Sequence, residues 1–149
     1  MSTSLTGEIT TVLGALGQDA FDPGGLELLT LAGATYDDES YPGEVYRTFP
    51  HTGITVVYEK KRAAMSAQAV FLYIAPQDGA SAYLTPDQLI DGLPLTTATR
   101  DDIRGFLGDA VCSEELFDIF AVEGGYLHIE FDADGALRQV TAMQEVPGL

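Results

Sequence analysis

Two stretches of this chain share one outline, and that repetition constrains the fold more than any other feature of the sequence. Residues 53–74 (GITVVYEKKRAAMSAQAVFLYI) and 124–143 (GGYLHIEFDADGALRQVTAM) each contain two apolar, alternating runs separated by a short polar turn. Alternation with a period of two places one set of side chains on a single face of a β-strand, so each stretch predicts a β-hairpin. Neither half of a 149-residue chain buries enough surface by itself, so we expect the two hairpins to share a core.

A helix is predicted ahead of each hairpin. The segment 5–17 (LTGEITTVLGALG) places its apolar residues on one helical face, with Thr6 as the expected N-cap. The segment 99–110 (TRDDIRGFLGDA) has Thr99 as its expected N-cap and Gly108 as its expected end. The predicted buried face of this second helix consists of Ile103, Phe106 and Leu107.

The other segments predict strands and connections. In the first half we expect a turn at 22–25, a loop at 35–42 and strands at 43–49, 53–60 and 67–76. In the second half we expect one helical turn at 86–90 and an antiparallel meander of strands at 115–125, 126–134 and 136–146. The sequence therefore predicts a single α+β domain, with an antiparallel sheet, helices on one face, and two αβββ units at roughly 1–76 and 77–149.

The balance of charge limits which partners this chain can bind. Seven lysines and arginines stand against 23 aspartates and glutamates, which gives a net charge of −16. Two stretches, 18–46 and 105–137, hold seven and eight acids respectively and no lysine or arginine. Nucleic acids and anionic membranes need a positive surface, so we exclude both, whereas a basic protein is a suitable partner. The alternative is that the acidity serves solubility.

No residue pattern in the chain predicts catalysis. His51 follows a proline in a loop, and His128 is expected to face solvent from a strand. The single cysteine, Cys112, lies among acids, which disfavour a reactive thiolate, and it allows no internal disulfide or cysteine-based zinc site. The sequence DADG at 132–135 begins like a calcium loop but lacks the later ligands, so it predicts a hairpin turn. We therefore expect no enzyme activity, no cofactor and no metal.

The sequence also carries no sign of a membrane or secretory segment. No stretch approaches the run of about 18 apolar residues that crosses a bilayer. The opening residues lack the basic region of a secretory signal and include an acid at Glu8. We therefore expect the protein in the cytoplasm.

The helix and hairpin of the second half follow a pattern that is known from other proteins. The matching residues are Leu93, Pro94, Ile103, Leu107, Gly108, Tyr126, Ile129, Phe131, Asp132, Asp134, Gly135, Leu137, Val140 and Thr141. This half resembles small bacterial immunity proteins of the bacteriocin (pyocin-type) and contact-toxin class, and the first half does so only loosely. The pattern is also similar to the tandem αβ repeats of β-lactamase inhibitor protein and to small lipoproteins of outer-membrane assembly, although this chain lacks the signal and lipidated cysteine of the lipoproteins. All of these families imply protein binding without catalysis.

The resemblance implies a cognate bacterial toxin as the partner. A toxin domain that attacks nucleic acid, such as a nuclease, is basic because it binds phosphate, and an acidic inhibitor covers that basic site with carboxylates. We therefore expect the binding residues in the two acid-only stretches, where tyrosines add rigid contact area in the first. The predicted partner-binding residues are Tyr36, Asp37, Asp38, Glu39, Tyr41, Glu44, Tyr46, Glu114, Glu115 and Asp118.

Two alternatives remain open at the level of sequence. A chaperone of the type III secretion class is also small, acidic and cytoplasmic, and it dimerises to hold a segment of an effector. Such chaperones usually end in a helix, whereas this chain ends in a predicted strand and a short tail. A monomer favours the immunity function and a stable dimer favours the chaperone, and the sequence does not decide between these states. The other alternative is a small-ligand binder or enzyme with a cavity under the sheet.

Overall fold

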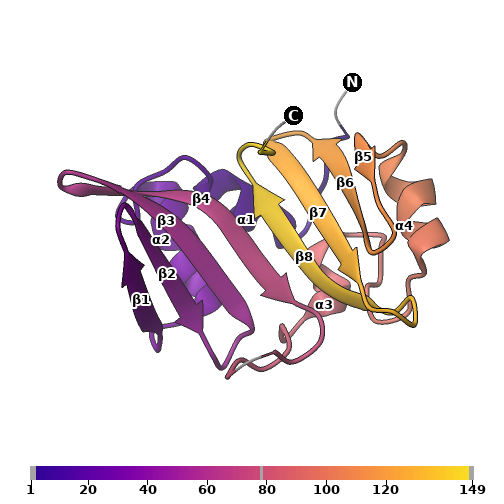
Figure 1. Ribbon diagram of the computed structural model, residues 1–149, viewed down its shortest axis with the longest axis horizontal. Coiled ribbons are helices and arrows are strands. Elements are labelled where there is room, and N and C mark those ends of the chain that lie inside the picture. The colour runs from indigo at the N-terminus through magenta and orange to yellow at the C-terminus, as the bar shows by residue number, and fades with distance from the viewer. Residues whose placement is uncertain (1–2, 78, 148–149) are drawn as a thin grey trace.

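The computed structural model describes residues 3–77 and 79–147, which form one antiparallel sheet backed by helices (Figure 1). The first half contains α1 (Ile9–Ala15), α2 (Pro23–Ala32), β1 (Asp37–Tyr41), β2 (Glu44–Phe49), β3 (Ile54–Lys61) and β4 (Ala64–Tyr73). The second half contains α3 (Pro86–Leu89), α4 (Arg100–Leu107), β5 (Cys112–Ser113), β6 (Phe117–Val122), β7 (Gly125–Phe131) and β8 (Leu137–Met143). The eight strands are ordered β1-β2-β3-β4-β8-β7-β6-β5, and the predicted α+β fold is confirmed.

The strand order shows that the second half repeats the first. In each half two helices precede four strands that pair in sequence, and the last strands, β4 and β8, pair with each other at the centre of the sheet. Val70 of β4 lies opposite Ala142 of β8 in this central pair. Each unit holds four strands rather than the predicted three, because the segments 37–41 and 112–113 add an edge strand at either end of the sheet.

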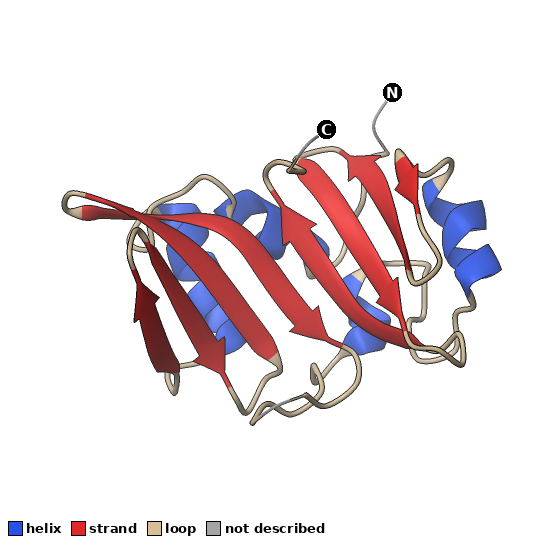
Figure 2. Ribbon diagram, in the orientation of Figure 1, coloured by secondary structure: helices blue, strands red, loops and turns tan. Residues whose placement is uncertain are grey.

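The helices cover one face of the sheet, and this face holds the core. Figure 2 shows α1, α2 and α3 behind the strands, with α4 at the β5 end. Val56 and Ile129 are fully or almost fully buried on this face, together with Ile9 of α1 and Leu28 of α2. Alternation along the strands directs these apolar side chains to one side. No helix formed by the described residues crosses the opposite face.

Helix α4 follows the local sequence signals closely. The Thr99 hydroxyl accepts a hydrogen bond from the Asp102 backbone N–H, and the Asp102 carboxylate accepts one from the Thr99 N–H, which completes a capping box. Gly108, with φ of 87°, ends the helix as predicted. Ile103 and Leu107 are buried, but the prediction for Phe106 was wrong, because its ring packs at the surface near Gly92 and remains 39% exposed.

Two predictions in the first half were also wrong. Helix α1 begins at Ile9 with Glu8 as its N-cap, so Thr6 lies outside it. The residues 22–25 do not form a separate turn but begin α2, with Pro23 in its first turn. Gly25 packs so closely against the backbone of Asp19 and Ala20 that an added Cβ would overlap the Asp19 carbonyl oxygen. Glycine at this position therefore permits close packing rather than breaking the helix.

Candidate functional site

The candidate site is the face of the sheet opposite the helices, which we call the open face. Alternation and strand register place Asp37, Glu39, Tyr41, Glu44 and Glu59 at its β1–β2 end and the following side chains on the rest of it: Tyr46, Thr48, Thr55, Val57, Ala69, Phe71, Tyr73, Gln139, Thr141, Met143, Tyr126, His128, Glu130, Phe117, Ile119 and Ala121. Most of these residues are aromatic, apolar or hydroxylated. A sheet face of this composition that faces away from the core is typical of a binding surface.

The centre of the open face is uncharged. One row of directly opposed residues crosses it from β2 to β7: Tyr46, Val57, Ala69, Met143 and Tyr126. The next row runs parallel to it: Thr48, Thr55, Phe71, Thr141 and His128. Neighbouring members of each row come from adjacent strands, so their side chains form a continuous surface.

A groove of about 520 Å³ lies in this surface, above strands β2, β3, β4 and β8. Its apolar lining includes Val57, Ala69, Phe71 and Met143. Ala69 has the smallest side chain of its row and lies between the larger side chains of Val57 and Met143. Tyr46, Gln68, Glu44 and Glu145 also line the groove.

The first set of predicted binding residues, at 36–46, is divided between the two faces of the sheet. Asp37, Glu39 and Tyr41 of β1 lie opposite residues of the open face in β2, and Glu44 and Tyr46 of β2 lie on that face too. Tyr36 and Asp38 lie toward the helical side. The Asp38 carboxylate accepts two hydrogen bonds from Arg47, at 2.9 and 3.0 Å, and the Arg47 guanidinium lies 4.1 Å from the centre of the Tyr36 ring.

Three glutamates lie close together at the β1–β2 end of the open face. Glu44 of β2 lies directly opposite Glu59 of β3. The Glu59 carboxylate is 2.7 Å from Lys61 Nζ, but the Lys61 side chain is 80% exposed, so solvent weakens that ion pair. Like charges that face each other across a strand pair destabilise it. Glu39 lies nearby, opposite Tyr46, and accepts a hydrogen bond from the Tyr41 hydroxyl at 2.7 Å. We call Glu39, Glu44 and Glu59 the acidic corner.

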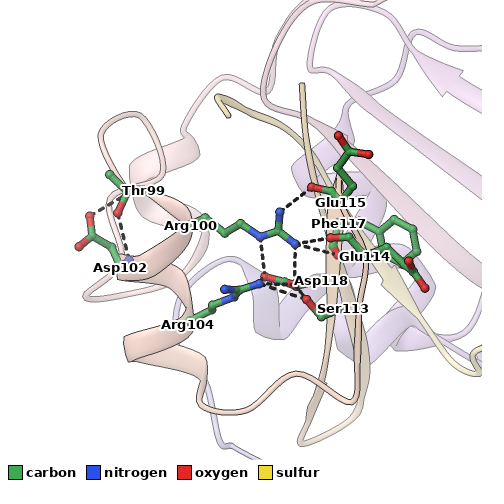
Figure 3. A network of polar contacts seen from close by, with 9 residues as sticks. All are labelled: Thr99, Arg100, Asp102, Arg104, Ser113, Glu114, Glu115, Phe117 and Asp118. Atoms are coloured by element: carbon green, nitrogen blue, oxygen red, sulfur yellow. Dashed lines mark hydrogen bonds and ion pairs between the residues drawn. The ribbon is translucent and has the colours of Figure 1, made fainter. Parts of the chain in front are cut away.

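The second set of predicted binding residues contains one structural residue, Asp118. Its side chain is 0% exposed and accepts hydrogen bonds from Arg100, Arg104 and Ser113 at 2.6 to 3.1 Å (Figure 3). Burial alone raises the pKa of Asp118, but the hydrogen bonds from the two arginines and the serine outweigh it and hold the pKa well below its usual value. Asp118 therefore joins α4 to β5 and β6 and has no accessible atom for a partner.

The other two residues of this set, Glu114 and Glu115, are exposed in the β5–β6 hairpin. Their backbone carbonyls accept hydrogen bonds from Arg100 at 2.6 and 2.7 Å, so the hairpin is held against α4 (Figure 3). They lie at the β5 end of the sheet, whereas the acids of β1 and β2 lie at the other end. The fold therefore does not bring the two predicted acidic sets together.

Sequence reasoning missed the uncharged centre of the open face. The strands 54–61 and 117–122 carry apolar residues at both alternate positions, such as Val56 and Val57 or Phe120 and Ile119. Such a strand predicts burial on both sides. In this sheet helices cover one side only, so the second apolar set is the signal that a surface is available for binding.

Among residues 3–77 and 79–147, no group of three histidine, cysteine, aspartate or glutamate side chains could hold a metal ion. His128 lies on the open face, opposite Leu127, Ile129 and Phe131 as predicted, but it is half-buried there, with its ring stacked 4.6 Å from that of Phe117, and this burial lowers its pKa. The Asp132 carboxylate accepts hydrogen bonds from the backbone N–H groups of Asp134 and Ala136, which confirms the predicted hairpin turn.

Comparison of this chain with models of protein families, with curated proteins and with solved structures gave no match. Across the part of the chain that the structure describes, none of the helices has the length and apolar character needed to cross a bilayer.

Proposed function

We propose that this protein is a non-enzymatic binding domain whose open face covers a basic protein, as an immunity protein covers its cognate toxin in the cytoplasm. The observation that carries this proposal is the composition of the open face, which has an uncharged aromatic and apolar centre and carboxylates at its β1–β2 end. Tyrosine, phenylalanine and methionine are enriched at the centres of protein interfaces, where charged residues are depleted.

The charge of the molecule supports a basic partner. Five of the seven basic side chains form ion pairs within the described residues, so most of the 23 acids have no basic neighbour. A surface with this excess of negative charge repels nucleic acid and accelerates encounter with a positive protein. A toxin that binds phosphate, such as a nuclease, presents a positive surface of this kind.

The proposal is tested with three baits in a lysate of the native cell. The baits are the unmodified chain, a Tyr126→Arg variant on the open face, and a Leu26→Arg variant on the outer side of α2 as the matched control. We expect a basic protein to be retained by the first and third baits and lost with Tyr126→Arg, because the added charge repels the partner and lies in the contact area.

Other outcomes contradict the proposal in distinct ways. Equal retention of the partner by all three baits would mean that the open face is not the binding surface. Capture of an acidic partner would contradict the expectation that the negative charge of this protein selects a basic one. A secreted effector held through an extended segment, by a bait that is a stable dimer in light scattering, would point instead to the chaperone function.

A further inference from the structure

The groove on the open face has the shape and chemistry of a receptor for one long cationic side chain. It lies where the two halves of the sheet meet, with Ala69 of β4 directly opposite Met143 of β8. Its volume of about 520 Å³ is ample for a single side chain. A partner lying across the open face would therefore cross the groove beside the central strand pair.

The floor of the groove suits the aliphatic part of such a side chain. Val57 is only 6% exposed, and Ala69, Phe71 and Met143 are half-buried, so a docked chain of methylene groups would find apolar contacts below it. Lysine and arginine commonly pack their stems on apolar surface in this way while the charged end reaches polar groups.

The rim of the groove offers hydrogen-bond acceptors that are not paired with a lysine or arginine of the described residues. Glu44 and Glu145 line it, and neither forms an ion pair within the described residues. The Gln68 side-chain nitrogen contacts Ser66, so its carbonyl oxygen remains available. None of the described residues that line the groove is lysine or arginine. A cation bound there would also offset the repulsion between Glu44 and Glu59, which face each other across β2 and β3.

Building on the proposed function, we propose that this groove accepts an arginine side chain of the basic partner. The guanidinium is planar, weakly hydrated and able to donate several hydrogen bonds at once, which suits a rim of two carboxylates and an amide oxygen. The rings of Tyr46 and Phe71 line the same groove, and arginine stacks on aromatic faces more readily than lysine does.

The test uses a single capped arginine and does not require the partner. N-acetyl-arginine methylamide is titrated into the isotopically labelled full chain, and the NMR signals of the Ala69 amide and the Met143 methyl group are followed. We expect saturable shifts at these positions, with a dissociation constant on the order of millimolar, because one side chain makes few contacts. The uncharged analogue N-acetyl-citrulline methylamide is expected to produce no saturable shift.

Paired variants separate the groove from general attraction to an acidic protein. The double variant Glu44→Gln/Glu145→Gln is expected to weaken binding of the arginine probe roughly fivefold, because it removes both rim carboxylates. Glu27→Gln/Glu123→Gln removes the same charge from other exposed positions and should leave binding unchanged. Equal effects from the two pairs, equal shifts with citrulline, or binding of N-acetyl-lysine methylamide as tight as that of arginine would overturn the assignment.

This result is independent of the capture experiment. If the arginine probe does not bind but a basic protein is still lost with Tyr126→Arg, the proposed function stands and the groove assignment fails. If the arginine probe binds as expected but no basic protein is captured, the groove is a guanidinium site and the proposed function fails.

Discussion

The two outer ends of the sheet use their acidic residues in opposite ways. At the β5–β6 end, Asp118 is completely buried and two arginines of α4 are hydrogen-bonded to it. At the β1–β2 end, Asp38 pairs with Arg47, but Asp37, Glu39 and Glu44 are exposed, with no ion pair among the described residues. Burial and nearby arginines therefore decide whether an acidic residue supports the fold or is available to a partner. The number of acids in a stretch of sequence does not decide this.

The largest expected difference between the two ends concerns stability. Asp118→Ala leaves the partly buried Arg100, the more exposed Arg104 and Ser113 without their common acceptor, so we expect a loss of about 3 kcal/mol in the free energy of unfolding. Asp38→Ala removes a pair at the exposed edge and should lose no more than about 1 kcal/mol. Urea unfolding of the two variants measures the contrast. Equal losses would mean that the Asp118 cluster stabilises the fold no more than a surface pair does.

The same cluster predicts a dependence of stability on pH. The pKa of Asp118 in the folded protein lies below its unfolded value, so the ionised carboxylate stabilises the fold fully above the unfolded pKa of about 3.9. That stabilisation declines as the pH falls from this value toward the folded pKa. The difference in unfolding free energy between the unmodified protein and Asp118→Asn should therefore be greatest near neutral pH and shrink below about pH 4. A difference that stays constant down to acidic pH would contradict this assignment.

A smaller effect is expected at the start of α4, which carries both arginines to Asp118. Thr99→Ala removes the capping-box hydroxyl and should reduce the unfolding free energy by about 1 kcal/mol. Asp101→Ala, in the same turn but outside the capping box, should lose only a few tenths of a kcal/mol through the helix dipole. Thermal unfolding followed by circular dichroism compares the two variants, and a ranking in the opposite order would show that the cap does not hold the helix.

The contrast also explains what sequence reasoning found and what it missed. The cap at Thr99 and the turn at 132–135 depend on neighbouring residues, so local patterns predicted them. The sequence predicts a loop at 35–42, whereas residues 37–41 (DDESY) form β1; an edge strand with every residue exposed needs no apolar alternation, so its sequence does not reveal it. The burial of Asp118 does have a sequence signal. Alternation in 117–122 places Asp118 on the same face as the apolar residues Phe120 and Val122.

The pairing of the two halves could not be predicted in the same way. It depends on β4 meeting β8, which are far apart in sequence, and on helices that cover one face of the combined sheet. Nothing in 64–73 or in 137–143 specifies the partner strand, because the first is apolar at most positions and the second at several, and many pairings satisfy such patterns. The groove on the open face is lined by β4 and β8 together, so it exists only once this central pair has formed and no single segment of the sequence predicts it.

The smallest predicted effect bears most directly on the open face. If Glu44 and Glu59 repel each other across β2 and β3, Glu44→Gln should increase the unfolding free energy by about 0.3 kcal/mol in low salt. The gain should shrink as salt screens the exposed charges, whereas Glu27→Gln, far from this pair on α2, should give a smaller gain. The urea unfolding midpoints of the Glu44→Gln and Glu27→Gln variants, measured at two salt concentrations, give the two gains and their dependence on salt. A variant that became more stable while losing affinity for arginine would mean that the acidic corner is retained for binding at the expense of the fold, and a variant that became less stable would show that Glu44 supports the sheet instead.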